Sequence, residues 1–208
     1  MRFLIYTTLA YGAQGISYYV YCFPGHIGGI VLPDGTPTPL YHALKTLNRE
    51  FVAIATELQP LLCRGVCHTG MMPPGAVPLP EHTSFTFDPP IPAVPYKVNA
   101  RVEGMLLSRF GNAEASSHAV VVNLDYKAAR TVTLADPAPL EIFDATTGQW
   151  SPVAGPRVEL QLPGGGGNWC AWRECGDARE VRGCAWPRRT PHLPAPPHRR
   201  RTRDAGAE

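Results

Sequence analysis

Apolar side chains recur at helical spacing in two segments near the start of the chain. In residues 2–11 they cover most of the circumference, which is typical of a buried helix. In the second segment they return at steps of four and three, so that they share one face. Thr38 is placed as its N-cap, Pro39 as its first helical residue and Pro60 as its end. The pattern therefore predicts one short and one long helix.

A different pattern lies between these two helices. Residues 16–23 are aromatic and β-branched and carry no charge, and Gly12 and Gly15 stand before them. Such a run is typical of a strand that is buried on both faces, as strands of parallel sheets are. Helix, strand and helix in this order indicate the last unit of a (β/α) barrel. A generic helical hairpin with a strand between its helices is the alternative.

The remaining chain changes character twice. Residues 61–96 are rich in Pro and Gly and indicate a linker, with one short strand expected at 83–87. From residue 97 to 173, short alternating segments are separated by turn residues, which favours an antiparallel β-sandwich. The expected strands lie at 98–102, 105–110, 119–124, 130–134, 140–144, 158–162 and 168–172.

The last 35 residues, 174–208, contain few large aliphatic side chains and several basic blocks. They cannot bury enough apolar area to offset their chain entropy, so we expect a disordered tail. The predicted organisation is thus α+β: an incomplete barrel remnant at 1–60, a linker at 61–96, a sandwich at 97–173 and a disordered basic tail at 174–208.

Several of these segments resemble glycoside hydrolases of the β-galactosidase-like type. Residues 9–21 are similar to the seventh helix, glycine turn and aromatic eighth strand of such barrels, and residues 35–51 to the eighth helix. Residues 121–125, 143–148 and 160–166 are similar to the small sandwich that follows many of these barrels. Cys22 stands where these enzymes often place a Trp.

The resemblance implies what the chain can contribute to glycoside hydrolysis. That reaction needs two carboxyl groups on opposite sides of the sugar bond. In the family they are Glu residues on the fourth and seventh strands, which precede this sequence, so we assign no catalytic residue. Tyr21, Phe23 and His26 would point into the sugar pocket, because active sites lie at the C-terminal ends of barrel strands. For His26, a solvated loop residue is the favoured alternative.

Composition adds few further constraints. The net charge of +2 is too small to imply a nucleic-acid or membrane partner for the whole chain, and no apolar run is long enough to cross a bilayer. The basic tail makes nucleic acid a weaker possible partner. No cofactor motif occurs. Cys63, Cys67 and His68 have zinc-like spacing without a second ligand pair, so free thiols are favoured and no metal is assigned.

Two functional hypotheses follow. In the first, the chain is the C-terminal part of a glycosidase, inactive alone, with carbohydrate as its partner once the missing barrel is supplied. In the second, it is a non-enzymatic carbohydrate-binding or scaffold module. Trp150, Trp169 and Trp172 would then form a stacking platform for sugars. The alternation around Trp169 and Trp172 favours burial in the core instead.

Overall fold

The computed structural model describes residues 1–22, 25, 28–81, 83–98, 100, 103–112 and 115–172. The predicted tail, 174–208, and Phe23 and His26 lie outside these residues. The described chain is α+β, as predicted, with two helices and two sheets that are antiparallel except for one strand pair. Residues 1–174 form a single compact unit.

Both predicted helices are present. Helix α1 spans Arg2–Ala10 and α2 spans Pro39–Leu58. The helical spacing of α2 has the predicted result, because its buried side chains lie on one face: Leu44, Leu47, Ile54 and Leu58. The shorter helix differs from the prediction, since it is buried on one side only and Leu4 is exposed.

A seven-stranded sheet has the order β3-β1-β4-β5-β10-β7-β8, and a three-stranded sheet has the order β2-β6-β9. The strands are β1 Leu62–Met72, β2 Thr86–Phe87, β3 Ala93–Pro95, β4 Gly104–Gly111, β5 Ser116–Asn123, β6 Arg130–Ala135, β7 Leu140–Asp144, β8 Gln149–Pro152, β9 Arg157–Leu162 and β10 Gly167–Trp172. Six of the predicted strands are confirmed in β4, β5, β6, β7, β9 and β10. The seventh, at 98–102, lies partly outside the described residues.

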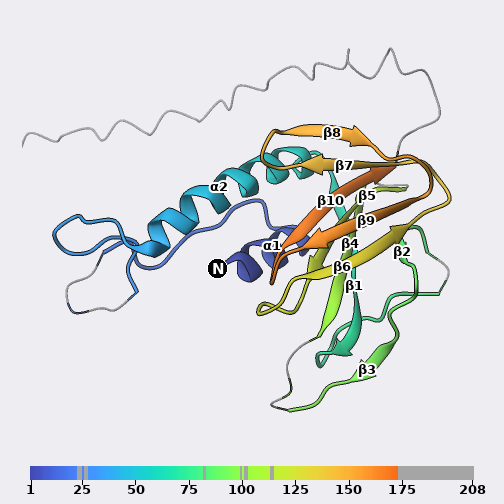
Figure 1. Ribbon diagram of the computed structural model, residues 1–208, viewed down its shortest axis with the longest axis horizontal. Coiled ribbons are helices and arrows are strands. Elements are labelled where there is room, and N and C mark those ends of the chain that lie inside the picture. The colour runs from blue at the N-terminus through green and yellow to red at the C-terminus, as the bar shows by residue number, and fades with distance from the viewer. Residues whose placement is uncertain are drawn as a thin grey trace, which may run out of the picture. The chain divides into compact units, whose positions relative to one another are not determined.

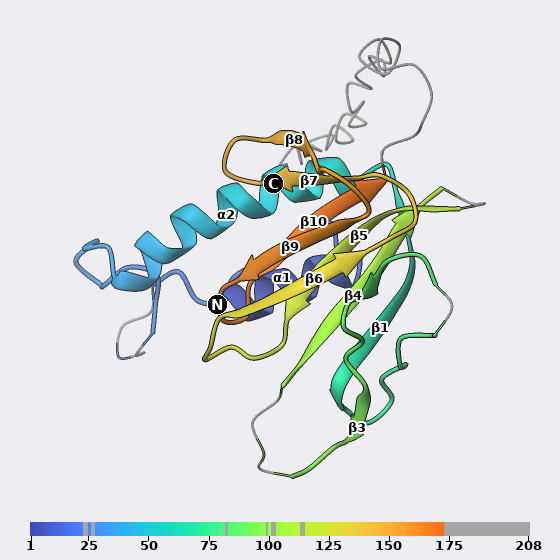
Figure 2. The same cartoon turned by 45° about the vertical axis from the view of Figure 1, so that its right-hand side comes forward.

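Alternation along the central strands places the large sheet between two apolar layers. On β4, Leu106 and Phe110 face the helices, while Met105 and Leu107 face the small sheet. Strands β5 and β10 divide their side chains in the same way. Figures 1 and 2 show the result, with both helices on one face of the large sheet and β6 and β9 on the other.

The prediction of a linker at 61–96 is wrong for the first third of this range. Residues 62–72 form β1, which pairs along its length with β4 through a register shift between Cys63 and Gly65. The sequence did not reveal this strand, because the region is rich in Pro and because the buried residues of the strand lie only in its second half. The short strand expected at 83–87 is confirmed as β2.

The predicted strand at 16–23 is also wrong for this chain. No residue of 16–22 pairs with a neighbouring strand in the described structure. A strand is defined by the hydrogen bonds of its ladder, and the described chain supplies no parallel neighbour here. The segment instead runs as extended backbone beside α2 (Figures 1 and 2).

Candidate functional site: an aromatic segment on α2

The segment from residue 12 to 22 leaves α1 through a tight backbone turn. Gly12 has a φ of +83°, a conformation that favours glycine. A Cβ added at this position would lie 2.9 Å from the Cβ of Cys63 on β1. The turn therefore fits closely against the edge of the large sheet, and a larger residue at position 12 would shift the path of the chain.

Burial alternates along the segment that follows. Ile16 and Tyr18 pack against the core between the helices and the large sheet. Their neighbours point the other way: Ser17 is exposed, the side chain of Tyr19 is 95% exposed and that of Tyr21 is 62% exposed. The segment thus has one side on the protein and a second, largely aromatic side in solvent.

Hydrogen bonds fix the covered side. The hydroxyl of Tyr18 donates to Oδ1 of Asn48 on α2 over 2.6 Å, and burial raises the pKa of this hydroxyl. The carbonyl of Tyr21 accepts bonds from the amides of Ile30 and Val31, at 2.9 and 3.0 Å. The segment is therefore attached to the N-terminal half of α2 and to the loop before it.

Of the three residues expected to contact sugar, the structure describes Tyr21. Its side chain is in solvent, where it is open to a ligand or to another polypeptide. Phe23 and His26 lie outside the described residues, so their role stays a prediction.

The three acidic side chains of residues 1–60 have structural partners. Glu50 accepts a hydrogen bond of 2.9 Å from the hydroxyl of Tyr6, and Glu57 one of 3.1 Å from the indole of Trp150. Asp34 accepts one of 2.9 Å from the amide of Thr36, and this bond lowers the pKa of its carboxyl. The bonds of Glu50 and Glu57 join distant parts of the fold, whereas that of Asp34 closes a local turn.

Sequence reasoning missed a polar pocket where the helices meet the large sheet. The pocket has a volume of about 280 Å³, and Arg2, Tyr6, Glu50, Asp144 and Asn168 are among its lining residues. Asp144 is not suited to donate a proton near neutral pH, because hydrogen bonds from Thr146 and Thr147 lower its pKa. No local pattern could have revealed this pocket, since it draws residues from four distant segments.

Trp169 and Trp172 belong to the core rather than to a sugar-binding surface, and Trp150 is partly buried against the same core as Trp169. Trp169 is 1% exposed and stacks on His118, with ring centres 5.1 Å apart. Trp172 is partly buried and stacks on Phe85 with an angle of 3° between the rings. The expectation that Trp169 and Trp172 are core residues is thus confirmed.

The cysteines with zinc-like spacing do not meet at one point. Cys63 is exposed and Cys67 is buried, both on β1, and neither forms a disulfide. Among the described residues, no three His, Cys, Asp or Glu side chains gather in a way that suits a metal ion. Burial raises the pKa of the Cys67 thiol, which disfavours the thiolate that zinc requires.

In the described part of the chain, neither helix has the length and apolar character that a bilayer crossing demands. Searches for similar proteins return no matching family model, curated protein or solved structure.

Proposed function

We propose that this chain is the C-terminal part of a β-galactosidase-like glycoside hydrolase. It supplies the last strand and helix of a (β/α) barrel, together with a sandwich that braces them, and it has no catalytic carboxylates of its own. The observation that carries the proposal is the alternation along residues 16–22, with one side on α2 and the aromatic side in solvent.

This alternation is what a barrel strand would retain if its neighbours were removed. In such a barrel each strand is followed by a helix that covers its outer side, while its inner side faces the barrel interior. Here Tyr18 bonds to α2, the helix that follows, and Ile16 packs on the core to which α2 contributes. The side that would face the interior carries Tyr19 and Tyr21, whose side chains are exposed.

The sandwich supports the same proposal through its contact with the barrel unit. Residues of α1 and α2 share a core with β4, β5, β7 and β10. A sandwich held in this way would stiffen the last barrel unit and keep its strand in position. The resemblance at residues 121–166 suggests the same role.

The proposed chemistry divides between this chain and the missing one. Two carboxyl groups would come from strands that precede residue 1, one as proton donor and the other as nucleophile or base. Tyr21, Phe23 and His26 would contact a β-galactoside at the C-terminal end of the strand. Carbohydrate is then the partner of the completed barrel.

Complementation tests this proposal. The purified chain is mixed with a polypeptide that contains the first seven strand–helix units of a β-galactosidase-like enzyme, and hydrolysis of a chromogenic β-galactoside is measured. We expect no turnover from either part alone and measurable turnover from the mixture. The double variant Tyr19→Ser, Tyr21→Ser should lose at least tenfold in apparent affinity between the two parts.

Tyr126 provides a control, because its side chain is 60% exposed and its ring packs near Phe3 of α1 rather than on the segment. Tyr126→Ser should complement as well as the parent chain. Hydrolysis by the chain alone would refute the proposal. An equal loss of apparent affinity in Tyr126→Ser and in the Tyr19→Ser, Tyr21→Ser variant would refute it as well.

The exposed tyrosines also keep the second hypothesis open to test, because aromatic rings suit the apolar faces of sugars. As a carbohydrate-binding module, the chain would bind lactose without any added barrel. Isothermal titration with lactose distinguishes the two functions: binding that is lost in the Tyr19→Ser, Tyr21→Ser variant favours the module.

A further inference from the structure

Strand β6 has one side that is only partly paired. Along its other side it pairs with β9 over its whole length, from Arg130 to Ala135. On the open side, β2 covers only Leu134 and Ala135, and one further bond of 3.0 Å runs from the amide of Asp88 to the carbonyl of Thr133. The pairing stops there because Pro89 and Pro90 have no amide hydrogen.

The next free position on this side is Thr131. In an antiparallel ladder, every second residue directs both its N–H and its C=O to the same neighbour. Since Thr133 bonds toward β2, the amide and carbonyl of Thr131 also point to that side. In the described part of the chain no strand occupies the place opposite Thr131, and its side chain is exposed.

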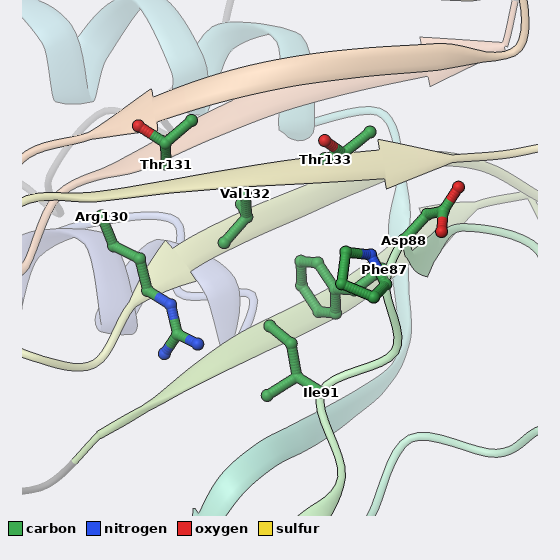
Figure 3. A pocket seen from close by; sticks show the side chains of 8 residues that line it. Phe87, Asp88, Ile91, Arg130, Thr131, Val132 and Thr133 are labelled. Atoms are coloured by element: carbon green, nitrogen blue, oxygen red, sulfur yellow. The ribbon is translucent and has the colours of Figure 1, made fainter.

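A pocket of about 170 Å³ adjoins this open stretch of backbone. Figure 3 shows the side chains of Arg130 and Val132 on the face of β6 that is turned toward Ile91 and Phe87, with Thr131 on the opposite face. The apolar lining comes from Phe87, Pro89, Ile91 and Val132, and the guanidinium of Arg130 lies at one end. The pocket is thus apolar with a single cation beside it.

We propose that this edge binds an extended peptide segment of another protein by strand addition. The peptide pairs with the backbone of Thr131, places one aliphatic side chain in the pocket and directs an acidic side chain to Arg130. Main-chain bonds would supply affinity, and the pocket and cation would supply selectivity.

Charge favours an acidic partner over a second copy of this chain. Asp88, the carboxylate that lines the pocket, already pairs with Arg157 at 2.6 Å. Antiparallel pairing of two β6 edges about Thr131 would bring their Arg130 side chains into diagonal positions, where like charges repel. An inward-pointing charge of this kind also discourages edge-to-edge aggregation.

The test uses a fluorescein-labelled ten-residue peptide of alternating sequence, with one leucine and one glutamate two positions apart. Fluorescence anisotropy measures its binding to the full chain, and amide NMR shifts locate it. We expect saturable binding with a shift of the Thr131 amide. N-methylation of the peptide amide that pairs with Thr131 should weaken binding at least tenfold, because it removes the hydrogen bond and leaves the side chains.

Charge exchange gives an independent readout. Arg130→Glu should weaken binding of the glutamate peptide about tenfold and restore it for a peptide with lysine in its place. Binding that is indifferent to N-methylation or to Arg130→Glu would overturn the proposal, as would no binding at millimolar peptide. If Arg130→Val self-associates and binds no peptide, Arg130 serves only to prevent edge-to-edge pairing of two copies. This result would also overturn the proposal.

Discussion

The indole N–H of Trp150 donates a hydrogen bond of 3.1 Å to Oε2 of Glu57, which joins β8 to the last turns of α2. The two residues are 93 positions apart in the sequence. The bond is partly buried and lies where the helix layer meets the outer strands of the large sheet. It is therefore a direct probe of how firmly the proposed barrel unit is held by the sandwich.

Removing the acceptor should loosen this junction. Glu57→Ala leaves the indole N–H without its partner, and we expect a loss of about 1 kcal/mol in the free energy of unfolding. Glu57→Gln keeps an acceptor oxygen and should lose less than half as much. Urea unfolding followed by circular dichroism measures both. A Glu57→Ala variant as stable as the parent chain would mean that the bond contributes nothing to stability.

Truncating the buried face of α2 should have a larger effect. Leu47→Ala removes a side chain from the core between the helices and the large sheet, and we expect a loss of about 2–5 kcal/mol. Val52→Ala, on the exposed side of the same helix, should change stability by less than about 0.5 kcal/mol. A Leu47→Ala variant as stable as Val52→Ala would show that α2 does not dock as described.

Stability should fall on mild acidification because of His118. Its ring stacks on Trp169, and burial lowers its pKa to about 4. The unfolded chain, with a His pKa of about 6.5, then binds more protons than the folded chain between these two values. Stability is therefore complete above about pH 6.5 and declines as the pH falls toward 4, by roughly 3 kcal/mol from this residue.

The variant His118→Phe keeps the aromatic contact with Trp169 and removes the titration. Its unfolding free energy should depend less steeply on pH between 6.5 and 4 than that of the parent chain. A parent chain and a His118→Phe variant with the same slope would contradict the assignment.

The alkylation rate of each cysteine should follow the solvent exposure of its thiol. Cys170 is fully buried, and burial raises the pKa of its thiol to about 12, so almost no thiolate forms at pH 8. Cys63 lies at the edge of the sheet, where partial burial raises the pKa of its thiol but leaves it exposed to solvent. With iodoacetamide and peptide mass mapping, Cys63 should be alkylated in the folded protein and Cys170 only after unfolding. Alkylation of both at one rate would be inconsistent with the fold.

The helices and most strands could be predicted because their burial follows a local period. The face of α2 that contains Leu44 and Leu47 and the strict alternation of Val158, Leu160 and Leu162 on β9 are both visible in the sequence. Strand β1 could not be seen, since its first residues are exposed and its register shifts at Gly65. Strand β8 is four residues long and ends in Pro152, which leaves no period to detect.

The candidate site was only half predictable. The sequence correctly marks residues 16–22 as an unusual aromatic run, but composition does not reveal whether a partner is present. Ile16 and Tyr18 alternate with Tyr19 and Tyr21 because the first two pack against the core between the helices and the large sheet. The open edge at Thr131 depends on where Pro89 interrupts a strand more than forty positions away, so the sequence of β6 gives no sign of it.

The alternation of the aromatic segment has a consequence for the order of events in the cell. Both hydrophobic cores close without the side chains of Tyr19 and Tyr21. The three layers can therefore fold before any partner strand binds. In the proposed barrel, this unit would then join the strands that precede it in a docking step between two folded parts, in place of the pairing of the first and last strands of one ring.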